Sequence, residues 1–224
     1  SDPDGDLLFV EEVNGDAGNI GAPIAGSTGG LFTVNADGSY SFDANGDFED
    51  LDVGETRTTT ITYLVSDGEG GTDLATVTVT VQGANDAPVR TGTLAPQSGD
   101  DSAALIPLDA STIFDDVDGE ELTFSAPDMP SWMNIDPVTG EVTGTPPSDA
   151  SQGGPNGDGV YTVTIVATDP DGESVSTTVT YTIANPAPTA FDDIEVTDEN
   201  TVLSDSVLSD NGNGADNDPD GDVL

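Results

Sequence analysis

The sequence lacks several residue types on which catalytic and cross-linked sites depend. It contains no histidine and no cysteine, and its two basic residues are Arg57 and Arg90, so lysine is absent as well. A Ser–His pair, a thiolate nucleophile, a Schiff-base lysine and a disulfide are therefore excluded. A carboxylate pair could be drawn almost anywhere among 44 acidic residues, which leaves a two-acid hydrolase without specific support. We expect a protein that is not an enzyme.

Long apolar stretches are missing too. No run is long enough to cross a bilayer, and no segment with a basic part followed by an apolar part begins the chain. The hydrophobic residues, 34% of the total, are spread evenly, so small cores can form along the whole chain. We expect the chain to be a piece of something longer.

Acidic residues are present in large excess, 44 against 2 basic ones, for a net charge of −42. Such a surface repels nucleic acid and anionic membranes, so its partners should be cations or cationic. The carboxylates also repel each other, and Ca²⁺, which takes roughly six to eight oxygen ligands, is the natural counter-ion. The alternative is adaptation to high salt, in which acidic residues keep a protein hydrated without a specific ion.

Short stretches rich in Val, Thr, Ile and Tyr alternate with turns rich in Gly, Asn and Asp. The first five predicted strands are LLFVEEV, GLFTV, SYSFD, TTTITYLVS and DLATVTVTV, and NADG before Ser39 predicts a hairpin turn. The pattern restarts after Pro88 with AALIPL, ELTFSA, SWMNIDPVTGEVTGTP, VYTVTIVATD and SVSTTVTYTIA. Because no stretch has a helical period, the sequence predicts an all-β fold of tandem β-sandwiches.

An internal repeat sets the predicted domain boundaries. TTITYLVSDGEGGTDLATVTVTVQGANDAPV from Thr59 aligns with YTVTIVATDPDGESVSTTVTYTIANPAPT from Tyr161, and each closes with Asn and Pro. These are the last hairpins of two similar domains. We predict a module lacking its first strands at 1–87, a complete module at 88–187 and the first strands of a further module at 188–224.

The chain opens on SDPDGDLL and closes on NDPDGDVL, which is nearly the same acidic phrase. In one interpretation, the one we favour, the chain is an excerpt from a longer tandem array. In the other, the carboxy-terminal strands of one subunit complete the amino-terminal sheet of the next, which gives a fibre by strand complementation.

Several of these motifs resemble known families. DGSYSF, LDVGET, ITYLVSDGEGGTD and NDAP make residues 1–87 similar to VCBS-type cadherin-like repeats of bacterial surface proteins. FDDVDGEELTFSA, PSWMNIDPVTGEVTGTP and YTVTIVATDPDG make residues 88–187 similar to a dystroglycan-type cadherin-like domain. VTDENT near Glu199 resembles the early-strand Glu-Asn of cadherin repeats.

The resemblance implies Greek-key sandwiches arranged end to end in an extracellular protein, such as a secreted RTX-type bacterial adhesin or surface filament. It also implies Ca²⁺ at the joints between domains, and neighbouring repeats or other subunits of the fibre as partners. The joints depart from the animal pattern: the first reads ANDAP, and the second reads ANPAP with Pro186 in place of an Asp. The second joint is therefore expected to bind less calcium or none.

If the modules stack as cadherin repeats do, oxygen ligands converge at each joint. The expected set at the first joint is Asp67, Asn85, Asp86, Asp115, Asp116 and Asp118; at the second it is Asp169, Asp171, Asn185, Asp192, Asp193 and Glu199. Alternating acids in the terminal phrases are further candidates, with solvated turns as the alternative: Asp2, Asp4, Asp6, Asp218, Asp220 and Asp222. Each bound ion would cancel like charges and stiffen the joint.

Two functions remain from the sequence. One is a calcium-stiffened spacer, whose function lies in stiffness and reach. The other is a carbohydrate-binding module, a role of some related domains, in which Trp132 would stack on a sugar. A large aromatic residue between Pro130 and Met133 more often anchors a small core, and we expect that role for Trp132.

Overall fold

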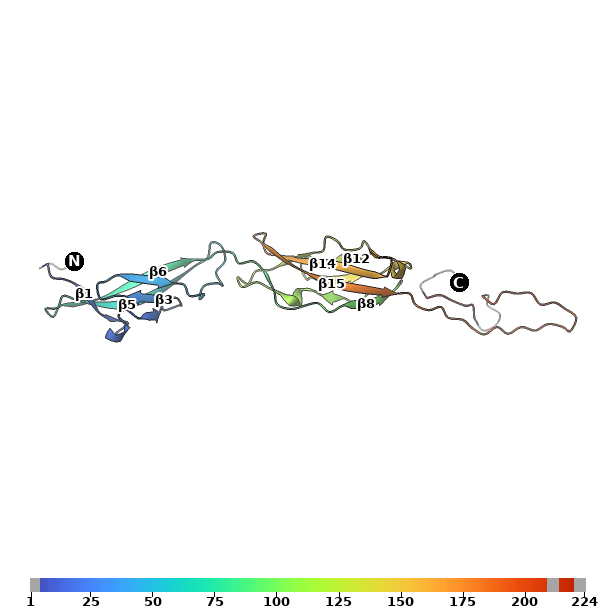
Figure 1. The fold of residues 1–224 in the computed structure, drawn as a ribbon, viewed down its shortest axis with the longest axis horizontal. Coiled ribbons are helices and arrows are strands. Elements are labelled where there is room, and N and C mark those ends of the chain that lie inside the picture. The colour runs from blue at the N-terminus through green and yellow to red at the C-terminus, as the bar shows by residue number, and fades with distance from the viewer. Residues whose placement is uncertain (1–4, 209–213, 220–224) are drawn as a thin grey trace. The chain divides into compact units, whose positions relative to one another are not determined.

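The computed structural model describes residues 5–208 and 214–219. By its contacts the chain divides into two compact units (Figure 1). The first unit comprises Ser1–Asp86 together with Asp116–Glu120, and the second comprises Ala87–Asp115 and Glu121–Leu224. The described helices are three short 3₁₀ turns, Ala17–Asn19, Ser111–Ile113 and Ala150–Gln152, so no described helix is long and apolar enough to cross a membrane.

The first unit contains two three-stranded antiparallel sheets. One has the order β1-β5-β6, and its strands are Phe9–Val13, Thr56–Ser66 and Thr72–Gln82. The other has the order β2-β3-β4, and its strands are Pro23–Ala25, Leu31–Val34 and Tyr40–Asp43. The long β5–β6 hairpin pairs without interruption from Thr56 opposite Gln82 to Ser66 opposite Thr72.

The core of the first unit lies between its sheets. Val10, Val13 and Ile61 from one sheet form a buried cluster with Phe32 and Val34 from the other. Alternation places Phe32 and Val34 on one face of β3, and the bulge between Val10 and Glu12 brings Val10 and Val13 to the same face of β1, so the two sheets bury these side chains against each other.

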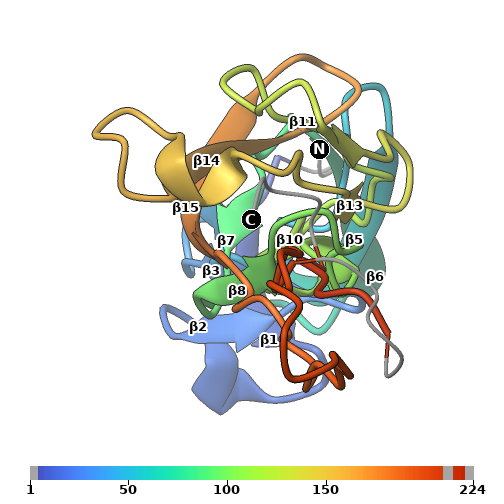
Figure 2. The same cartoon turned by 90° about the vertical axis from the view of Figure 1, so that its right-hand side faces the viewer.

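The second unit is a larger sandwich. One sheet has the order β11-β14-β15-β8, and its strands are Thr123–Ser125, Val160–Thr168, Ser174–Ala184 and Gln97–Asp100. The second sheet has the order β12-β13-β9, with strands Met133–Ile135, Glu141–Gly144 and Leu108–Asp109; a ribbon pairs β10 (Phe114–Asp115) with β7 (Val89–Arg90). β8 lies beside β15 and pairs with it in parallel, from Gln97 opposite Tyr181 to Asp100 opposite Ala184 (Figure 2).

The core of the second unit joins its sheets in the same manner. Val163, Ile165 and Tyr181 on the long hairpin are at most 1% exposed and belong to one cluster with Met133 and Val142 of the facing sheet. Leu94 and Leu105 also pack in this cluster. They lie on either side of β8, so the segment that supplies β8 also closes the edge of the core.

Most predicted strands are confirmed. The NADG turn is confirmed as well: the Asn35 N–H donates to the Ser39 carbonyl over 2.8 Å, and Gly38 has a φ of +81°. The predicted strand AALIPL is wrong except at its end, where β9 begins at Leu108. Leu105 instead buries its side chain in the core, and Pro107 has no N–H to donate.

The segment from Pro188 does not form the strands predicted for it. Residues 188–208 contain no strand, and Thr189 makes an isolated bridge to Asn217. A strand needs a partner to satisfy its backbone groups, and the described residues supply this segment with no ladder.

Candidate metal centre

Three acidic side chains converge in the first unit. Asp116, Asp118 and Glu120 each offer a carboxylate oxygen, and these oxygens lie within 4.8 Å of one another. The residues alternate along the segment Asp116–Glu120, which we call the acidic loop. A carboxylate oxygen of Asp52 also lies within 4.8 Å of one from Glu120.

Hydrogen bonds hold the acidic loop in this conformation. The Asp118 N–H donates to Asp116 Oδ1 over 3.0 Å, and the Gly119 N–H donates to the Asp116 carbonyl over 3.1 Å. Gly119 has a φ of +77°, a region that disfavours residues with a Cβ atom. The Asp86 N–H donates to Asp118 Oδ2 over 2.7 Å, which ties the loop to the end of the first unit.

Several side-chain oxygens in and next to the acidic loop are inaccessible to solvent. Oδ1 of Asp118 is buried and accepts no hydrogen bond from the described residues. Oxygens Oδ2 of Asp116, Oε2 of Glu120 and Oδ1 of Asn85 are buried as well. Burying a carboxylate is costly unless a hydrogen-bond donor or a cation compensates it.

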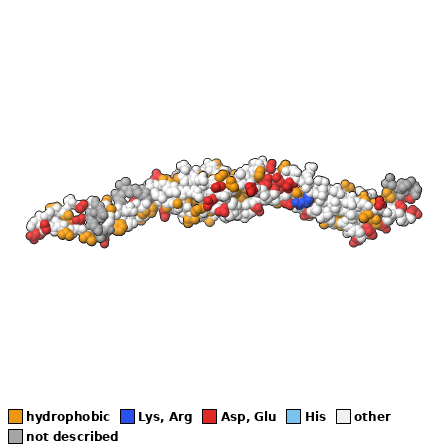
Figure 3. Space-filling view, turned by 180° about the vertical axis from the view of Figure 1, so that it is seen from behind, with side chains coloured by type: hydrophobic (Ala, Val, Ile, Leu, Met, Phe, Trp, Pro, Cys, Tyr) orange, Lys and Arg blue, Asp and Glu red, His pale blue; other side chains and the backbone are white. Residues whose placement is uncertain are grey.

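The basic residues are engaged elsewhere. Arg57 forms a two-pronged pair with Asp50 at 2.8 and 3.0 Å, and Arg90 donates to Thr177 Oγ1 over 3.2 Å. Acidic side chains are spread widely over the face in Figure 3, where basic ones occupy one small spot. Asp50 and Thr177 both lie outside the acidic loop.

The oxygen set fits a hard divalent cation. Oxygens within 4.8 Å of one another can all reach an ion at the Ca²⁺–oxygen distance of roughly 2.3–2.6 Å. Carboxylates are ligands that Ca²⁺ prefers, and the amide oxygen of Asn85 and water could complete its shell. Asp116, Asp118 and Glu120 would hold the ion.

The structure brings together part of the set predicted for the first joint. Asp86, Asp116 and Asp118 are in hydrogen-bond contact, and Asn85 directly precedes Asp86. Asp115 is exposed in β10, where it pairs with Val89.

Asp67 does not join this set. It lies in the β5–β6 turn, where it accepts hydrogen bonds from the N–H groups of Glu69 (2.7 Å) and Gly71 (2.9 Å). Those bonds, the one from Glu69 first, hold the pKa of Asp67 below its ordinary value. The linker follows the opposite end of β6, about 35 Å away at ~3.4 Å per residue. Convergence of Asp67 with Asn85 was therefore a wrong expectation, because a hairpin puts its turn and its chain ends at opposite ends.

The residues predicted for the second joint are not brought together either. Asp169 lies in the β14–β15 turn, where Oδ1 accepts from the N–H groups of Gly172 (2.6 Å) and Glu173 (2.9 Å). Asp171 lies in the same turn, again at the opposite end of the hairpin from Asn185. The remaining members are exposed on the segment without strands: Asp192, Asp193 and Glu199.

The terminal acidic phrases are described only in part. Asp6 is exposed and Asp218 is half-buried. The other four candidates, Asp2, Asp4, Asp220 and Asp222, lie outside the described residues.

Sequence reasoning missed Glu120, although a signal was present. The acidic loop reads DVDGE, which repeats the DPDGD of residues 2–6 and 218–222 with Val in place of Pro and Glu in place of the last Asp. Aligning the three phrases would have named the third carboxylate. Asp52 carries no comparable signal, because it approaches Glu120 only in the folded chain.

Trp132 has the core role expected of it. Its side chain is half-buried and packs against the core of the second unit, edge-on to Tyr161 with ring centroids 5.3 Å apart.

Protein-family models match residues of both units. Residues 1–83 match the model described as "Bacterial cadherin-like domain", and residues 87–184 match "Putative Ig domain". No curated protein matches the chain.

Solved structures show the same fold at low sequence identity. Mouse cadherin-23 EC22-24 is 13% identical with a TM-score of 0.55, over 86% of this chain and 60% of that one. Human mucin-like protocadherin EC1-2 is 14% identical with a TM-score of 0.51, over 82% of this chain and 86% of that one. An endo-fucoidan hydrolase from glycoside hydrolase family 107 is 20% identical with a TM-score of 0.36, over 81% of this chain and 24% of that one.

Proposed function

We propose that the chain is an extender repeat of an extracellular bacterial adhesin or surface filament, stiffened by Ca²⁺. The proposal is supported by the match of residues 1–83 to a bacterial cadherin-like domain and of residues 87–184 to a putative Ig domain. The acidic loop is the calcium site in this proposal. The partners are neighbouring repeats or other subunits of the same fibre. The role is mechanical, and catalysis has no part in it.

One observation carries the calcium proposal. Three carboxylates converge within 4.8 Å, and Oδ1 of Asp118 is buried without a hydrogen-bond donor among the described residues. A solvated acidic turn would direct its carboxylates into water, where their repulsion is screened. Oxygens that are both buried and mutually repelling instead favour a bound cation.

In this proposal, an ion bound to the acidic loop reduces the flexibility of the chain where the first unit ends. The acidic loop belongs to the first unit by its contacts, although its neighbours along the chain, Asp115 and Glu121, belong to the second. When bound, Ca²⁺ supplies positive charge that cancels the repulsion of the loop. Asp118 accepts the Asp86 N–H, so ordering of the loop also orders the end of the first unit. Removal of the ion restores repulsion and loosens this part of the chain.

The test compares cations on the intact chain. Thermal unfolding is followed in chelator, in millimolar CaCl₂, in millimolar MgCl₂ and in molar NaCl. The proposal expects saturable stabilisation by Ca²⁺ that exceeds the effect of the other two salts. Equal stabilisation by NaCl would indicate general adaptation to salt and would remove the basis for a specific site.

A further inference from the structure

The first unit has an open sheet edge at β6, whereas the equivalent edge of the second unit is paired. β6 pairs with β5 on one side, and no described strand pairs with its other side. In the second unit the equivalent strand β15 pairs with β14 on one side and with β8 on the other. Unpaired strand edges present a row of N–H and C=O groups to any chain that can add to them.

Equivalent positions of the two hairpins differ in burial. The last residue pair before the turn is Ser66 with Thr72 in the β5–β6 hairpin and Thr168 with Ser174 in the β14–β15 hairpin. A residue of the first hairpin therefore corresponds to the residue 102 positions later in the second. Inward-facing Val179, Tyr181 and Ile183 of β15 are 1–3% exposed. Their counterparts on β6 are all only half-buried: Val77, Val79 and Val81. The same faces are thus covered in the second unit and partly uncovered in the first.

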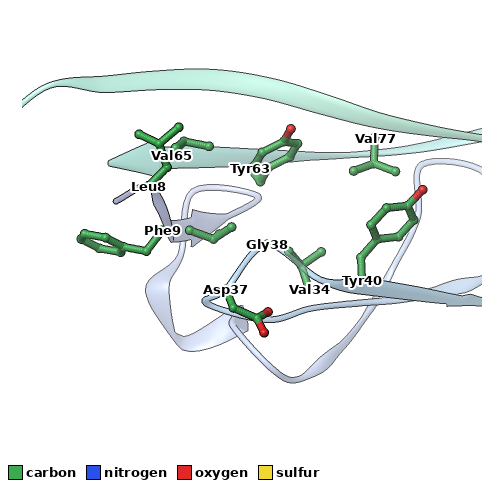
Figure 4. A pocket seen from close by; sticks show the side chains of 10 residues that line it. Leu8, Phe9, Val34, Asp37, Gly38, Tyr40, Tyr63, Val65 and Val77 are labelled. Carbon is green, nitrogen blue, oxygen red and sulfur yellow. The ribbon is translucent and has the colours of Figure 1, made fainter. Parts of the chain in front are cut away.

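A groove meets this uncovered face at Val77. It is lined mainly by apolar side chains from both sheets and from the start of β1, among them Leu8, Val34, Tyr40, Tyr63, Val65 and Val77. Figure 4 shows Tyr63, Val65 and Val77 on one side of the opening and Val34 and Tyr40 on the other. The counterparts of Tyr63 and Val65, Ile165 and Ala167, are 0% exposed in the second unit.

The segment after ANPAP is a candidate to pair with the open edge of β6 and to occupy the groove. ANPAP before Thr189 matches ANDAP before Val89, a shift of 100 positions from 85 to 185. The segment after ANDAP supplies Leu94, β8 and Leu105 to the second unit. The segment after ANPAP has no strand, and its apolar side chains are exposed: Ile194 is 63%, Val196 90% and Val202 91% exposed.

We propose that residues 188–208 of a second copy add to the open edge of β6 as a parallel strand and fill the groove beside it. The inference rests on the proposed extender function, for which it names the joining segment. Copying the β8–β15 register places Thr80 opposite Asp198, as Thr182 lies opposite Ser98. Ile194 occupies the place that Leu94 has in the second unit. Copies joined in this manner form a head-to-tail chain.

Engineered cysteines test the register, since the chain has none of its own. Thr80→Cys is mixed with Asp198→Cys or Asn200→Cys, and the disulfides formed under mild oxidation are mapped by mass spectrometry. Paired strands bring Cα atoms within disulfide reach. Thr80→Cys mixed with Asp205→Cys is the mismatched control, and the double variant Ser98→Cys/Thr182→Cys is the positive control within one chain.

The expected result is a heterodimer linking position 80 to position 198 or 200, and little product with position 205. Sedimentation velocity should also show concentration-dependent oligomers. Ile194→Asp should weaken association about ten-fold or more, because a buried apolar contact is lost, whereas Val207→Asp should not. Both side chains are exposed in the single chain, at 63% and 72%, so neither change should unfold it.

Equal cross-linking at position 205, or a monomer at every concentration, would overturn the inference. The cross-linking is carried out in both chelator and CaCl₂ with added NaCl, because the two partners are acidic. Cross-linking without calcium binding would refute the calcium site alone, and calcium binding without cross-linking would refute strand addition alone.

Discussion

The backbone N–H of Asp86 donates to the carboxylate of Asp118 over 2.7 Å, across 32 positions of sequence. This contact joins the acidic loop to the segment that follows β6, four residues beyond its last residue, Gln82. It also uses one oxygen of Asp118 and leaves the other buried beside the oxygens of Asp116 and Glu120. The candidate calcium site therefore depends on Asp118 more directly than on any residue of the hairpin turns.

Asp118→Asn should weaken Ca²⁺ binding at least about ten-fold, because it removes one of three converging charges while keeping the side-chain shape. Isothermal titration measures the affinity. Asp67→Asn is the matched control, since Asp67 lies in the distant turn and should leave the affinity unchanged. Equal losses in the two variants would contradict the assignment.

The hairpins could be predicted from sequence, whereas the site could be predicted only in part. Alternating Thr and Val predicts β5 and β6, and NADG predicts the turn before Ser39, because these signals are local. β8 could not be predicted: QSGD has no strand propensity, and it pairs only because β15 offers an edge. The length of the predicted strands already implies that the β5–β6 turn and the linker lie at opposite ends of the hairpin. That inference would have removed Asp67 from the predicted ligand set.

Asp67 should also give the turn a defined pH dependence. Its pKa is lowered in the folded chain by N–H donors of the turn, Glu69 first, so its contribution is present above the ordinary value of 3.8. That contribution is lost as the pH falls below 3.8 through the folded pKa. The melting temperature of wild type minus that of Asp67→Asn should be positive and constant near neutrality and should shrink in acid. Taking the difference cancels the effect of acid on the other carboxylates, and adding chelator removes any effect of bound calcium. A difference that grows in acid would refute the role.

Two tyrosines of the second unit, the half-buried Tyr161 and the buried Tyr181, should respond differently to loss of the hydroxyl. Tyr161 donates to the Ala150 carbonyl over 2.8 Å, so Tyr161→Phe should cost about 1 kcal/mol. The hydroxyl of Tyr181 is buried with no hydrogen-bond partner among the described residues, and burial raises the pKa of Tyr181 to about 12. Tyr181→Phe should be neutral or stabilising. Denaturant unfolding in the same buffer compares them, and a larger loss at position 181 would contradict the packing described.

Gly119 should contribute to the stability of the acidic loop through its backbone conformation and not through side-chain packing. A Cβ there meets no atom within 4 Å, but its φ of +77° disfavours other residues. Gly119→Ala should cost about 1 kcal/mol and weaken Ca²⁺ binding, because it strains the loop that orients Asp118. Gly38→Ala is the control, since Gly38 has a φ of +81° and equally open space in a turn without the proposed ligands. It should lower stability similarly and leave calcium affinity unchanged; a similar loss of affinity in both would rule out a local effect.

Small-angle X-ray scattering of the intact chain, recorded in chelator and in CaCl₂, tests the stiffening directly. The wild-type profile should change on calcium addition towards that of a less flexible molecule, and the profile of Asp118→Asn should not. Wild-type profiles that coincide in the two buffers would contradict the account.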